Sequence, residues 1–304
     1  MSQVFVLGGT GAVGRHAVDA LLAAGHDVSA VARSDARAVE LADKGATPVR
    51  VSMFDAEALA AVFVGHDAVI NLATAIPSTN TFMFKRSWRA NDRIRTEGSA
   101  AVAQAALAAE VPRLVQESVV MLYADQGASW ISEDAPVDRY PISLGNHAAE
   151  ASAARFAREG GAGVVLRFGW FSGVGAAHSE AFLRLARRGL VVQMGDADTF
   201  VSSIDVADGG AAVVASLQAV PGVYNVVDDE PLTKRAFADA LEDAGGSRAW
   251  VRAPGRLASV LGDKTTSLTR SVRASNEKFR SATGWAPRYR SARESLQALA
   301  AADT

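Results

Sequence analysis

The sequence predicts an α/β protein built on a doubly wound parallel sheet, and three observations carry that prediction. Short apolar runs alternate with longer alanine-rich segments along the first half of the chain. A glycine-rich loop joins the first apolar run to the first alanine-rich segment. The composition, with 49% hydrophobic and 21% charged residues, is that of an ordinary globular protein.

The apolar runs have the length of buried strands, and the segments between them repeat apolar residues at helical spacing. Two segments, Ala12 to Ala24 and Thr96 to Ala109, end near Gly25 and Pro112, as helices do. Alternation of this kind predicts right-handed βαβ units and helices on both faces of the sheet. The predicted strands are Val4 to Leu7, Val28 to Val31, Ala68 to Leu72, Arg113 to Val115 and Val164 to Leu166.

Beyond Gly169 the pattern loosens into helices and short strands. We therefore expect a nucleotide-binding domain over residues 1–170 and a smaller α+β substrate-binding lobe over residues 171–304, some of whose elements can return to the main sheet. The segment Gly255 to Ser275 is rich in small and polar residues. It is a candidate for a mobile flap, and a solvated linker is an equal alternative.

Composition excludes several classes of function. A net charge of -2 provides no field for nucleic acid, and no apolar stretch is long enough to span a membrane. The chain has no cysteine, which excludes disulfides, zinc-thiolate sites and cysteine nucleophiles, and we expect no metal. The sequence thus predicts a cytoplasmic protein with a small-molecule partner, either a monomer or a homodimer.

The loop Gly8-Gly9-Thr10-Gly11-Ala12-Val13-Gly14 directly follows the first predicted strand and begins the first helix. Gly8 can form the tight turn, Gly11 lets a pyrophosphate approach the backbone, and Gly14 lets the helix pack on the sheet. The helix start offers unpaired N–H donors. In this context the loop predicts a Rossmann-like dinucleotide site rather than a plain strand-to-helix turn.

The end of the second strand indicates which dinucleotide is bound. Arg33 stands where an NAD-selective site places an acidic residue, and its guanidinium can bind a 2′-phosphate with help from Ser34, Arg15 and Arg37. This favours NADPH, although a surface arginine is the alternative. Asp55 can either accept from the adenine amino group or cap the helix that begins at Ala56.

These residues resemble the extended and atypical short-chain dehydrogenases/reductases, a group that includes NAD-dependent epimerases and dehydratases, over nearly the whole chain. The resemblance rests on the glycine loop, on Asp55, on Asn71-Leu72-Ala73-Thr74-Ala75, on Leu166-Arg167-Phe168-Gly169-Trp170-Phe171 and on Ser203-Ile204-Asp205-Val206-Ala207. It implies cofactor contacts from Leu72, Ala73 and Thr74 and, on the nicotinamide side, from Phe168 and Gly169.

The same resemblance exposes a gap in the expected catalytic residues. The family usually uses a serine and a Tyr-x-x-x-Lys pair for proton transfer. Counting back from Tyr123 places Val119, not Ser118, at the serine position. One register of the following helix places Ile142 and Asn146 at the tyrosine and lysine positions, and the register that uses Tyr140 places Leu144 at the lysine. The remaining catalytic candidates are Ser118, Tyr140 and His147, with Tyr123 as a further proton partner.

Aromatic residues gather where the substrate is expected, which favours a flat or bulky apolar substrate, although core packing is an equal alternative. They are Phe82, Trp88, Trp130, Trp170 and Phe171. Reduction needs only an oriented nicotinamide and an electrophilic carbon. We therefore expect an NADPH-dependent ketoreductase, similar to those of angucyclinone polyketide antibiotic pathways such as that of simocyclinone. Two alternatives are a non-catalytic NADPH-binding regulator and a sugar-nucleotide epimerase or dehydratase with relocated catalytic groups.

Overall fold

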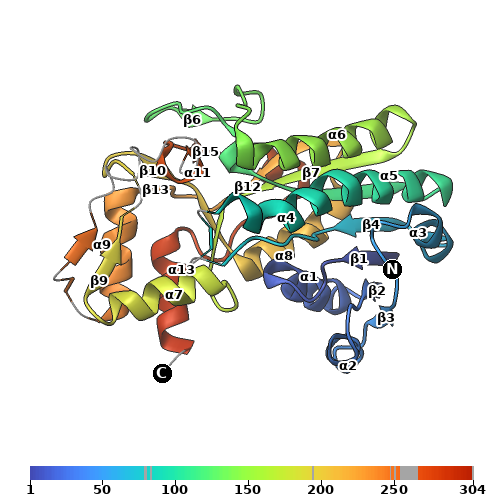
Figure 1. Cartoon of the computed structure of the whole chain (residues 1–304), viewed down its shortest axis with the longest axis horizontal. Helices are drawn as coiled ribbons and strands as arrows, with labels where there is room; N and C mark the ends of the chain where they lie inside the picture. The colour runs from blue at the N-terminus through green and yellow to red at the C-terminus, as the bar shows by residue number, and fades with distance from the viewer. Residues whose placement is uncertain are drawn as a thin grey trace.

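The fold is centred on a seven-stranded sheet in which every pair of neighbours is parallel (Figure 1). The structure is a computed structural model that describes residues 1–78, 81–82, 84–193, 195–246, 248–249, 251–253 and 266–302. In spatial order the strands are β12 (Gly222–Val226), β7 (Ala162–Phe168), β5 (Arg113–Val119), β4 (Ala68–Asn71), β1 (Gln3–Leu7), β2 (Asp27–Val31) and β3 (Thr47–Val49).

Helices cover both faces of this sheet, as the alternating sequence pattern predicts (Figure 1). On one face α1 (Ala12–Ala23), α2 (Asp35–Asp43), α8 (Val206–Ala215) and α12 (Glu277–Thr283) bury apolar side chains against β1, β2 and β12. On the other, α3 (Ala56–Phe63), α5 (Ser99–Ala108) and α6 (Leu144–Arg158) pack around Phe5 and Phe63, whose ring centroids lie 4.8 Å apart. The doubly wound α/β prediction is confirmed.

The strand order reverses beside β1, and this reversal positions the site. From β1 the chain proceeds outward through β2 and β3, and then returns to the other side of β1 to build β4, β5 and β7. Loops leaving β1 and β4 consequently run in opposite directions, which opens a crevice at the carboxyl ends of these strands.

A smaller unit follows β7 and is built mainly from helices. In it α7 (Ala177–Ala186), α9 (Lys234–Gly245) and α13 (Ala292–Ala302) pack around a separate core that includes Phe182, Phe237 and Leu296. Two-stranded sheets flank this unit: β8 (Trp170–Ser172) with β11 (Ser203–Asp205), β9 (Leu190–Val192) with β14 (Val251–Ala253), β10 (Phe200–Val201) with β13 (Leu232–Thr233), and β6 (Trp130–Ile131) with β15 (Arg273–Ala274).

Several segments return from the second half of the chain to the first. Strand β12 pairs with β7 from Gly222–Val164 to Val226–Phe168, and α8 packs on α1. Strands β10 and β11 lie on either side of Ser202 and belong to different sheets. No described helix is long and apolar enough to cross a membrane.

Short helical turns connect the larger elements near the crevice. The segment expected to be helical from Thr96 begins as a π-helical turn, η2 (Ile94–Gly98), before α5. Of the candidate flap or linker Gly255 to Ser275, residues 255–265 lie outside the described residues, and the described part includes α11 (Thr266–Thr269) and β15. The other turns are η1 (Lys85–Trp88), α4 (Arg89–Arg93), η3 (Val120–Leu122), η4 (Pro141–Ser143) and η5 (Ser216–Gln218).

Candidate cofactor and substrate site

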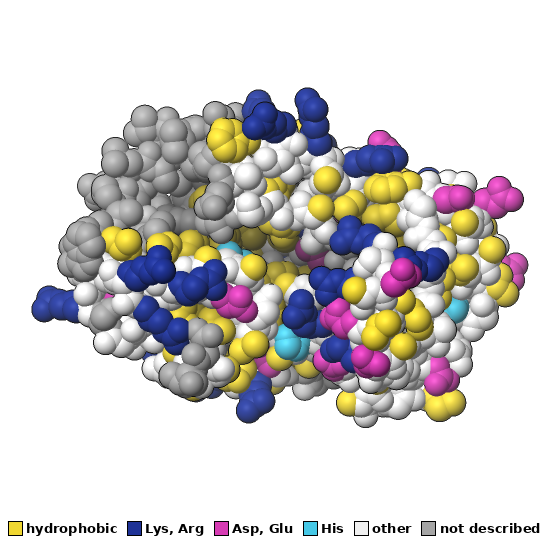
Figure 2. All heavy atoms as spheres, turned by 60° about the horizontal axis from the view of Figure 1, so that its bottom comes forward, with side chains coloured by type: hydrophobic (Ala, Val, Ile, Leu, Met, Phe, Trp, Pro, Cys, Tyr) yellow, Lys and Arg dark blue, Asp and Glu magenta, His cyan; other side chains and the backbone are white. Residues whose placement is uncertain are grey.

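A long cleft with a volume of about 1270 Å³ lies across the carboxyl ends of the central strands. It extends from Arg33 after β2, past the glycine loop, to Glu117 near the end of β5, and α7 forms its far wall. Figure 2 shows the hollow between the two parts of the molecule, with Lys and Arg side chains at its edges. The cleft is large enough for a dinucleotide together with part of a substrate.

The glycine loop has the geometry that a diphosphate needs. Gly8 adopts a positive φ of 82°, and a Cβ there would lie 2.6 Å from the Leu72 carbonyl. A Cβ on Gly14 would lie 2.0 Å from the Gly8 oxygen, so only glycine lets α1 approach β1 this closely. Gly11 begins α1 without a side-chain cap, which leaves the first-turn N–H groups directed at the cleft. Thr10, Ala12 and Val13 also line it.

Three arginines line the cleft around the end of β2, and they differ in their partners. Arg37 pairs with Glu40, and Arg50 pairs with Asp35. Arg33 has no ion-pair partner among the described residues, so its guanidinium is available to a ligand. Ser34 does not line the cleft, because its hydroxyl accepts from the Arg37 N–H and caps α2.

The residues that the family resemblance assigned to the cofactor divide into two groups. Leu72, Ala73 and Thr74 line the cleft directly after β4. Asp55 instead caps α3, accepting from the Ala58 N–H at 3.0 Å. Phe168 is fully buried in the core, and Gly169 lies so close to the adjacent strand that a Cβ would be 2.8 Å from the Ser203 carbonyl carbon.

Ser118 is committed to a buried network behind the cleft. Its hydroxyl donates to Glu150 Oε1 at 2.6 Å, and Arg167 donates to both oxygens of the same carboxylate at 2.8 Å. Ser118 is fully buried and does not line the cleft. Ser118, one of the catalytic candidates, therefore stabilises the contact between β5, β7 and α6.

The remaining proton-transfer candidates are also engaged elsewhere. Tyr140 donates to the Met121 carbonyl at 2.8 Å, and Tyr123 donates to Asn225 Oδ1 at 2.7 Å. Burial raises the pKa of each of these tyrosines to about 12, so neither ionises near neutral pH. The His147 Nε2–H donates to the Asp138 carbonyl at 2.8 Å. None of the three lines the cleft.

A buried ion pair lies close to the expected tyrosine and lysine positions. Glu117 lines the cleft, and its Oε2 lies 2.7 Å from Arg95, with both side chains 3% exposed. Arg95 packs against α6 at Gly145, the residue before Asn146, where a Cβ would lie 3.2 Å from the Arg95 Cβ. Burial raises the pKa of the Glu117 carboxyl, and the Arg95 guanidinium opposes that rise.

The aromatic residues do not form one surface. Phe171 lines the cleft, and Trp170 lines a second, smaller cavity beside it. Trp88 is buried, donates to the Phe82 carbonyl at 2.8 Å and packs edge-on against the Phe82 ring. Trp130 is 52% exposed and lies under the Arg273 guanidinium. Phe82, Trp88 and Trp130 line neither cavity.

Three further residues, Glu117, His178 and Lys234, become functional candidates only in the folded structure. Glu117 precedes Ser118 in the motif, so its strand position was visible, but its burial with Arg95 was not. His178 lines the cleft, donates from Nε2 to the Phe171 carbonyl at 2.5 Å, and has a pKa lowered by burial. Lys234 lies in the smaller cavity. The described residues include no group of His, Asp and Glu arranged to hold a metal ion.

The chain is similar to known proteins in both sequence and fold. Residues 4–226 match the sequence model of the NAD dependent epimerase/dehydratase family. The chain belongs to this family. Its solved structural neighbours include the UDP-glucose 4-epimerase of Thermus thermophilus in complex with NAD and a human epimerase family protein with NADPH. Both have a TM-score of 0.79 over 98% of this chain, which covers 98% and 99% of theirs, at 23% and 24% identity.

Two sequence relatives are oxidoreductases. The 3-diazoavenalumate denitrifying reductase of a Streptomyces species is 33% identical over 97% of this chain and 99% of its own length. The L-arabinose 1-dehydrogenase (NAD(P)(+)) of Haloferax volcanii is 34% identical, over 38% of this chain and 40% of its own. The relatives thus support an oxidoreductase of an NAD(P)-dependent family, and the recognition of the short-chain dehydrogenase/reductase group is confirmed.

Proposed function

We propose that the protein is an NADPH-dependent reductase that reduces a ketone of a bulky aromatic small molecule. The observation that carries this proposal is the continuous cleft, which joins the glycine loop and an arginine without an ion-pair partner among the described residues to Phe171 and the buried Glu117. When bound there, NADPH supplies the hydride.

The residues of the cleft fit NADPH in particular. The uncapped first turn of α1 and the close approach of Gly8 and Gly14 accommodate a diphosphate. Arg33 is placed to bind the 2′-phosphate because it lies at the end of β2 without another partner among the described residues. Arg37 and Arg50 line the same end of the cleft, but each is already paired with a carboxylate.

A ketone needs a proton as well as a hydride, and we propose Glu117 as its source. It is the acidic side chain that lines the cleft among the described residues, and burial raises the pKa of its carboxyl against the opposing effect of Arg95. His178 is less suitable: burial disfavours its charged form, and its Nε2–H is already donated to a carbonyl. Arg95 holds the Glu117 carboxyl in place.

A second candidate reaction is the reductive removal of a diazo group, and the full-length similarity to the denitrifying reductase favours it. In that reaction the C–N bond of an aryl diazonium ion breaks, N2 leaves, and a hydride takes its place on the ring. No alkoxide forms, so no acid is required at the reacting atom. The absence of a Tyr-x-x-x-Lys pair is compatible with this chemistry.

Stopped-flow oxidation of NADPH distinguishes the two candidates. Wild-type protein is offered a fused-ring aromatic ketone or an aryl diazonium salt, with alcohol and N2 measured as products. For ketone reduction, Glu117→Gln should lower the rate by about 100-fold, the usual contribution of a general acid. Ser118→Ala, Tyr140→Phe and His147→Ala should leave the rate unchanged, because these side chains do not line the cleft.

The outcomes separate the alternatives as follows. If the protein releases N2 from the diazonium salt and Glu117→Gln does so at the wild-type rate, denitrification would replace ketone reduction as the proposed reaction. NADPH binding without oxidation by either acceptor would contradict both and favour a regulator, and cofactor turnover without net oxidation would favour an epimerase. Thermal unfolding of Glu117→Gln controls for the loss of its ion pair with Arg95.

A further inference from the structure

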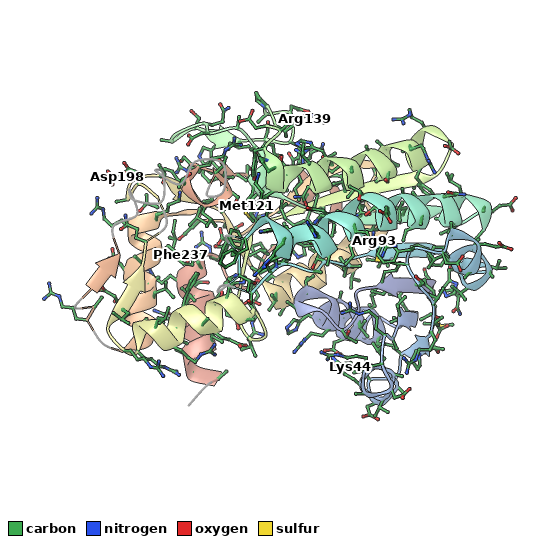
Figure 3. All side chains as sticks on the ribbon, in the orientation of Figure 1. Lys44, Arg93, Met121, Arg139, Asp198 and Phe237 are labelled. Carbon is green, nitrogen blue, oxygen red and sulfur yellow. The ribbon has the colours of Figure 1, made fainter. Side chains whose placement is uncertain are left out.

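The smaller cavity lies where the two parts of the chain meet. It is lined by Met121, after β5, and by Trp170, Lys234, Phe237 and Leu268 from the lobe. Figure 3 shows Met121 near the junction and Phe237 on the side of the lobe. We propose that this cavity binds a carboxylate of the aromatic substrate and that Lys234 is its ligand. The proposal rests on the proposed function only for the aromatic part of the substrate.

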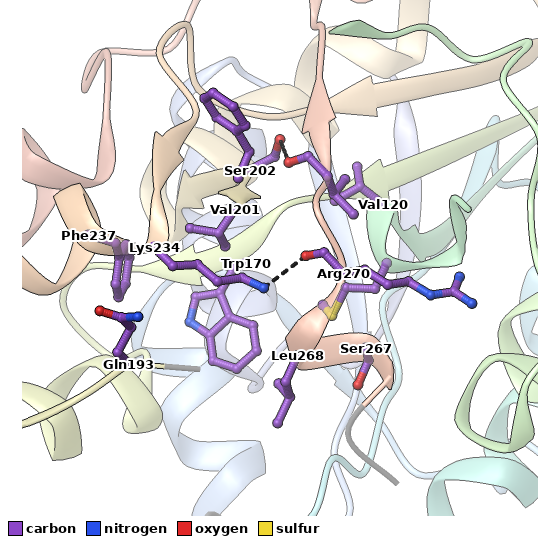
Figure 4. Close-up of a pocket in the computed structure, with 13 residues that line it drawn as sticks. Val120, Trp170, Gln193, Val201, Ser202, Lys234, Phe237, Ser267, Leu268 and Arg270 are labelled. Atoms are coloured by element: carbon purple, nitrogen blue, oxygen red, sulfur yellow. Dashed lines mark hydrogen bonds between the residues drawn. The ribbon is translucent and has the colours of Figure 1, made fainter. Parts of the chain in front are cut away.

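Lys234 is a buried cation with an incomplete set of partners. The side chain is 7% exposed, and its Nζ donates to the Arg270 carbonyl at 2.9 Å (Figure 4). An ammonium group has three N–H donors, and Lys234 makes no ion pair with any of the described residues. A buried charge without a counter-ion is costly, so an incoming carboxylate would find a favourable site.

The titration of Lys234 agrees with this geometry. Burial lowers its pKa to about 8, and Asp125 and Asp196 oppose that shift without reaching ion-pair distance. Asp125 already accepts from the Gly127 and Ser271 N–H groups. The Lys234 ammonium therefore stays charged at neutral pH, and no carboxylate of the described residues forms an ion pair with it.

Trp170 provides a second donor in the same cavity. Its indole Nε1 is buried and has no hydrogen-bond partner. Figure 4 shows Trp170 and Lys234 drawn together among the lining residues. Buried indole N–H groups usually find an acceptor, so the orphan donor indicates that an acceptor is supplied by a ligand.

The second cation of the cavity is not available to a ligand. The Arg270 guanidinium donates to Asp138 at 2.7 Å and to the Tyr123 carbonyl at 2.9 Å, and it stacks over the Tyr140 ring. In Figure 4 it points away from Lys234. One ammonium and one indole N–H suit a carboxylate, whereas a phosphate or diphosphate calls for more cationic donors.

The size and position of the cavity indicate how the rest of the ligand lies. Its volume of about 50 Å³ admits a carboxyl head, since one water needs roughly 10–15 Å³, but not a fused ring system. The ring must extend outward, and the cofactor cleft is adjacent: the Trp170 ring packs edge-on against His178, which lines the cleft, at 4.7 Å. The carboxylate would thus hold the substrate in the smaller cavity, with its ring extending into the cofactor cleft near His178.

Calorimetric titration with two matched probes tests the proposal. Naphthalene carboxylate and naphthalene carboxamide share a ring and differ in charge. NADP⁺-loaded wild-type protein should bind the carboxylate about tenfold or more tightly than the amide. Lys234→Met should abolish this preference by weakening the carboxylate alone. Trp170→Phe, which keeps an aromatic ring and removes the N–H, should weaken the carboxylate several-fold.

Lys278→Met is the matched control, because Lys278 also donates to a main-chain carbonyl, that of Val223, but lies outside the cavity. It should leave both affinities unchanged. Equal wild-type affinity for the two probes, or a carboxylate preference that survives Lys234→Met and Trp170→Phe, would overturn the assignment. Binding is measured without a hydride acceptor. A negative result in this titration therefore leaves the reductase proposal intact, and a failure to oxidise NADPH leaves the carboxylate site intact.

Discussion

Arg33 is the single residue on which the proposed cofactor preference depends. It lines the cleft after β2 and has no ion-pair partner among the described residues. Hydrogen bonds from a guanidinium to a phosphate contribute about 1.5–3 kcal/mol each. The free energy that separates NADPH from NADH binding should therefore depend mainly on this side chain.

Replacing Arg33 by aspartate should weaken NADPH binding by about 10- to 100-fold and leave NADH binding nearly unchanged. Fluorescence titration with both nucleotides measures the change. Arg139→Asp carries the same change of charge at an exposed position outside both cavities, and it should affect neither nucleotide. Equal weakening of NADPH and NADH by Arg33→Asp would remove the basis for the preference.

Asp228 is a second residue whose environment has a measurable consequence. It follows β12, is 3% exposed and accepts from the Ser203 hydroxyl. Burial raises its pKa from 3.8 to about 8. At neutral pH the folded protein therefore keeps this carboxyl protonated, while the unfolded chain ionises it.

The stability that Asp228 contributes is present in full below pH 3.8 and is lost as the pH rises toward about 8. Relative to Asp228→Asn, the wild type should lose on the order of 1 kcal/mol per pH unit over this window. Urea unfolding at several pH values gives the difference directly. The variant Asp134→Asn changes an exposed carboxyl and retains Asp228, so its stability should follow that of the wild type at every pH. A parallel pH dependence for wild type and Asp228→Asn would refute the assignment.

At the scale of elements, the junction between β1 and α1 forms the proposed site for the diphosphate. Because Gly8 and Gly14 have no side chains, the start of the helix can lie directly against the end of the strand. This close approach places the N–H groups of the first turn at the cleft surface.

Gly14→Ala should force α1 away from β1, since its Cβ would lie 2.0 Å from the Gly8 carbonyl oxygen. We expect a loss of about 3 kcal/mol or more in stability together with much weaker NADPH binding. Gly25→Ala is the control: Gly25 ends the turn after the same helix with a φ of 79° and nothing within 4 Å of its Cβ position. That change should cost only about 1 kcal/mol and spare the cofactor. Thermal unfolding and nucleotide titration of both variants check this, and normal NADPH binding by Gly14→Ala would contradict it.

At the scale of the whole molecule, the two parts of the chain are interlocked. Strand β12 completes the edge of the main sheet next to β7, and α8 covers α1. A chain that ends at residue 170 would expose the β7 edge and the apolar face of α1 that packs against Val213.

A fragment of residues 1–170 should therefore fail to unfold in a single cooperative transition, whereas the full chain should do so. Circular dichroism during urea unfolding distinguishes the two cases, and size-exclusion chromatography reports aggregation through the exposed edge. Cooperative unfolding of the fragment with the stability of the full chain would show instead that the first 170 residues form an independent domain.

The sequence by itself determined the parallel sheet, its alternation with helices and the position of the glycine loop between the first strand and the first helix. These features are local: buried strands, amphipathic helices and glycine positions are each recorded in consecutive residues. Arg33 and the segment Leu72 to Thr74 could be named as cleft candidates for the same reason, since each directly follows a predicted strand and each lines the cleft.

Only the tertiary structure decided which polar groups reach the cleft. Ser118, Tyr140 and His147 are suitable residue types, but each is bound to a partner from another element or loop. Conversely, Glu117 meets Arg95, and Lys234 meets the Arg270 carbonyl, across 22 and 36 residues of sequence. Whether a side chain is buried, paired or free depends on neighbours brought together by packing, and no local pattern records them.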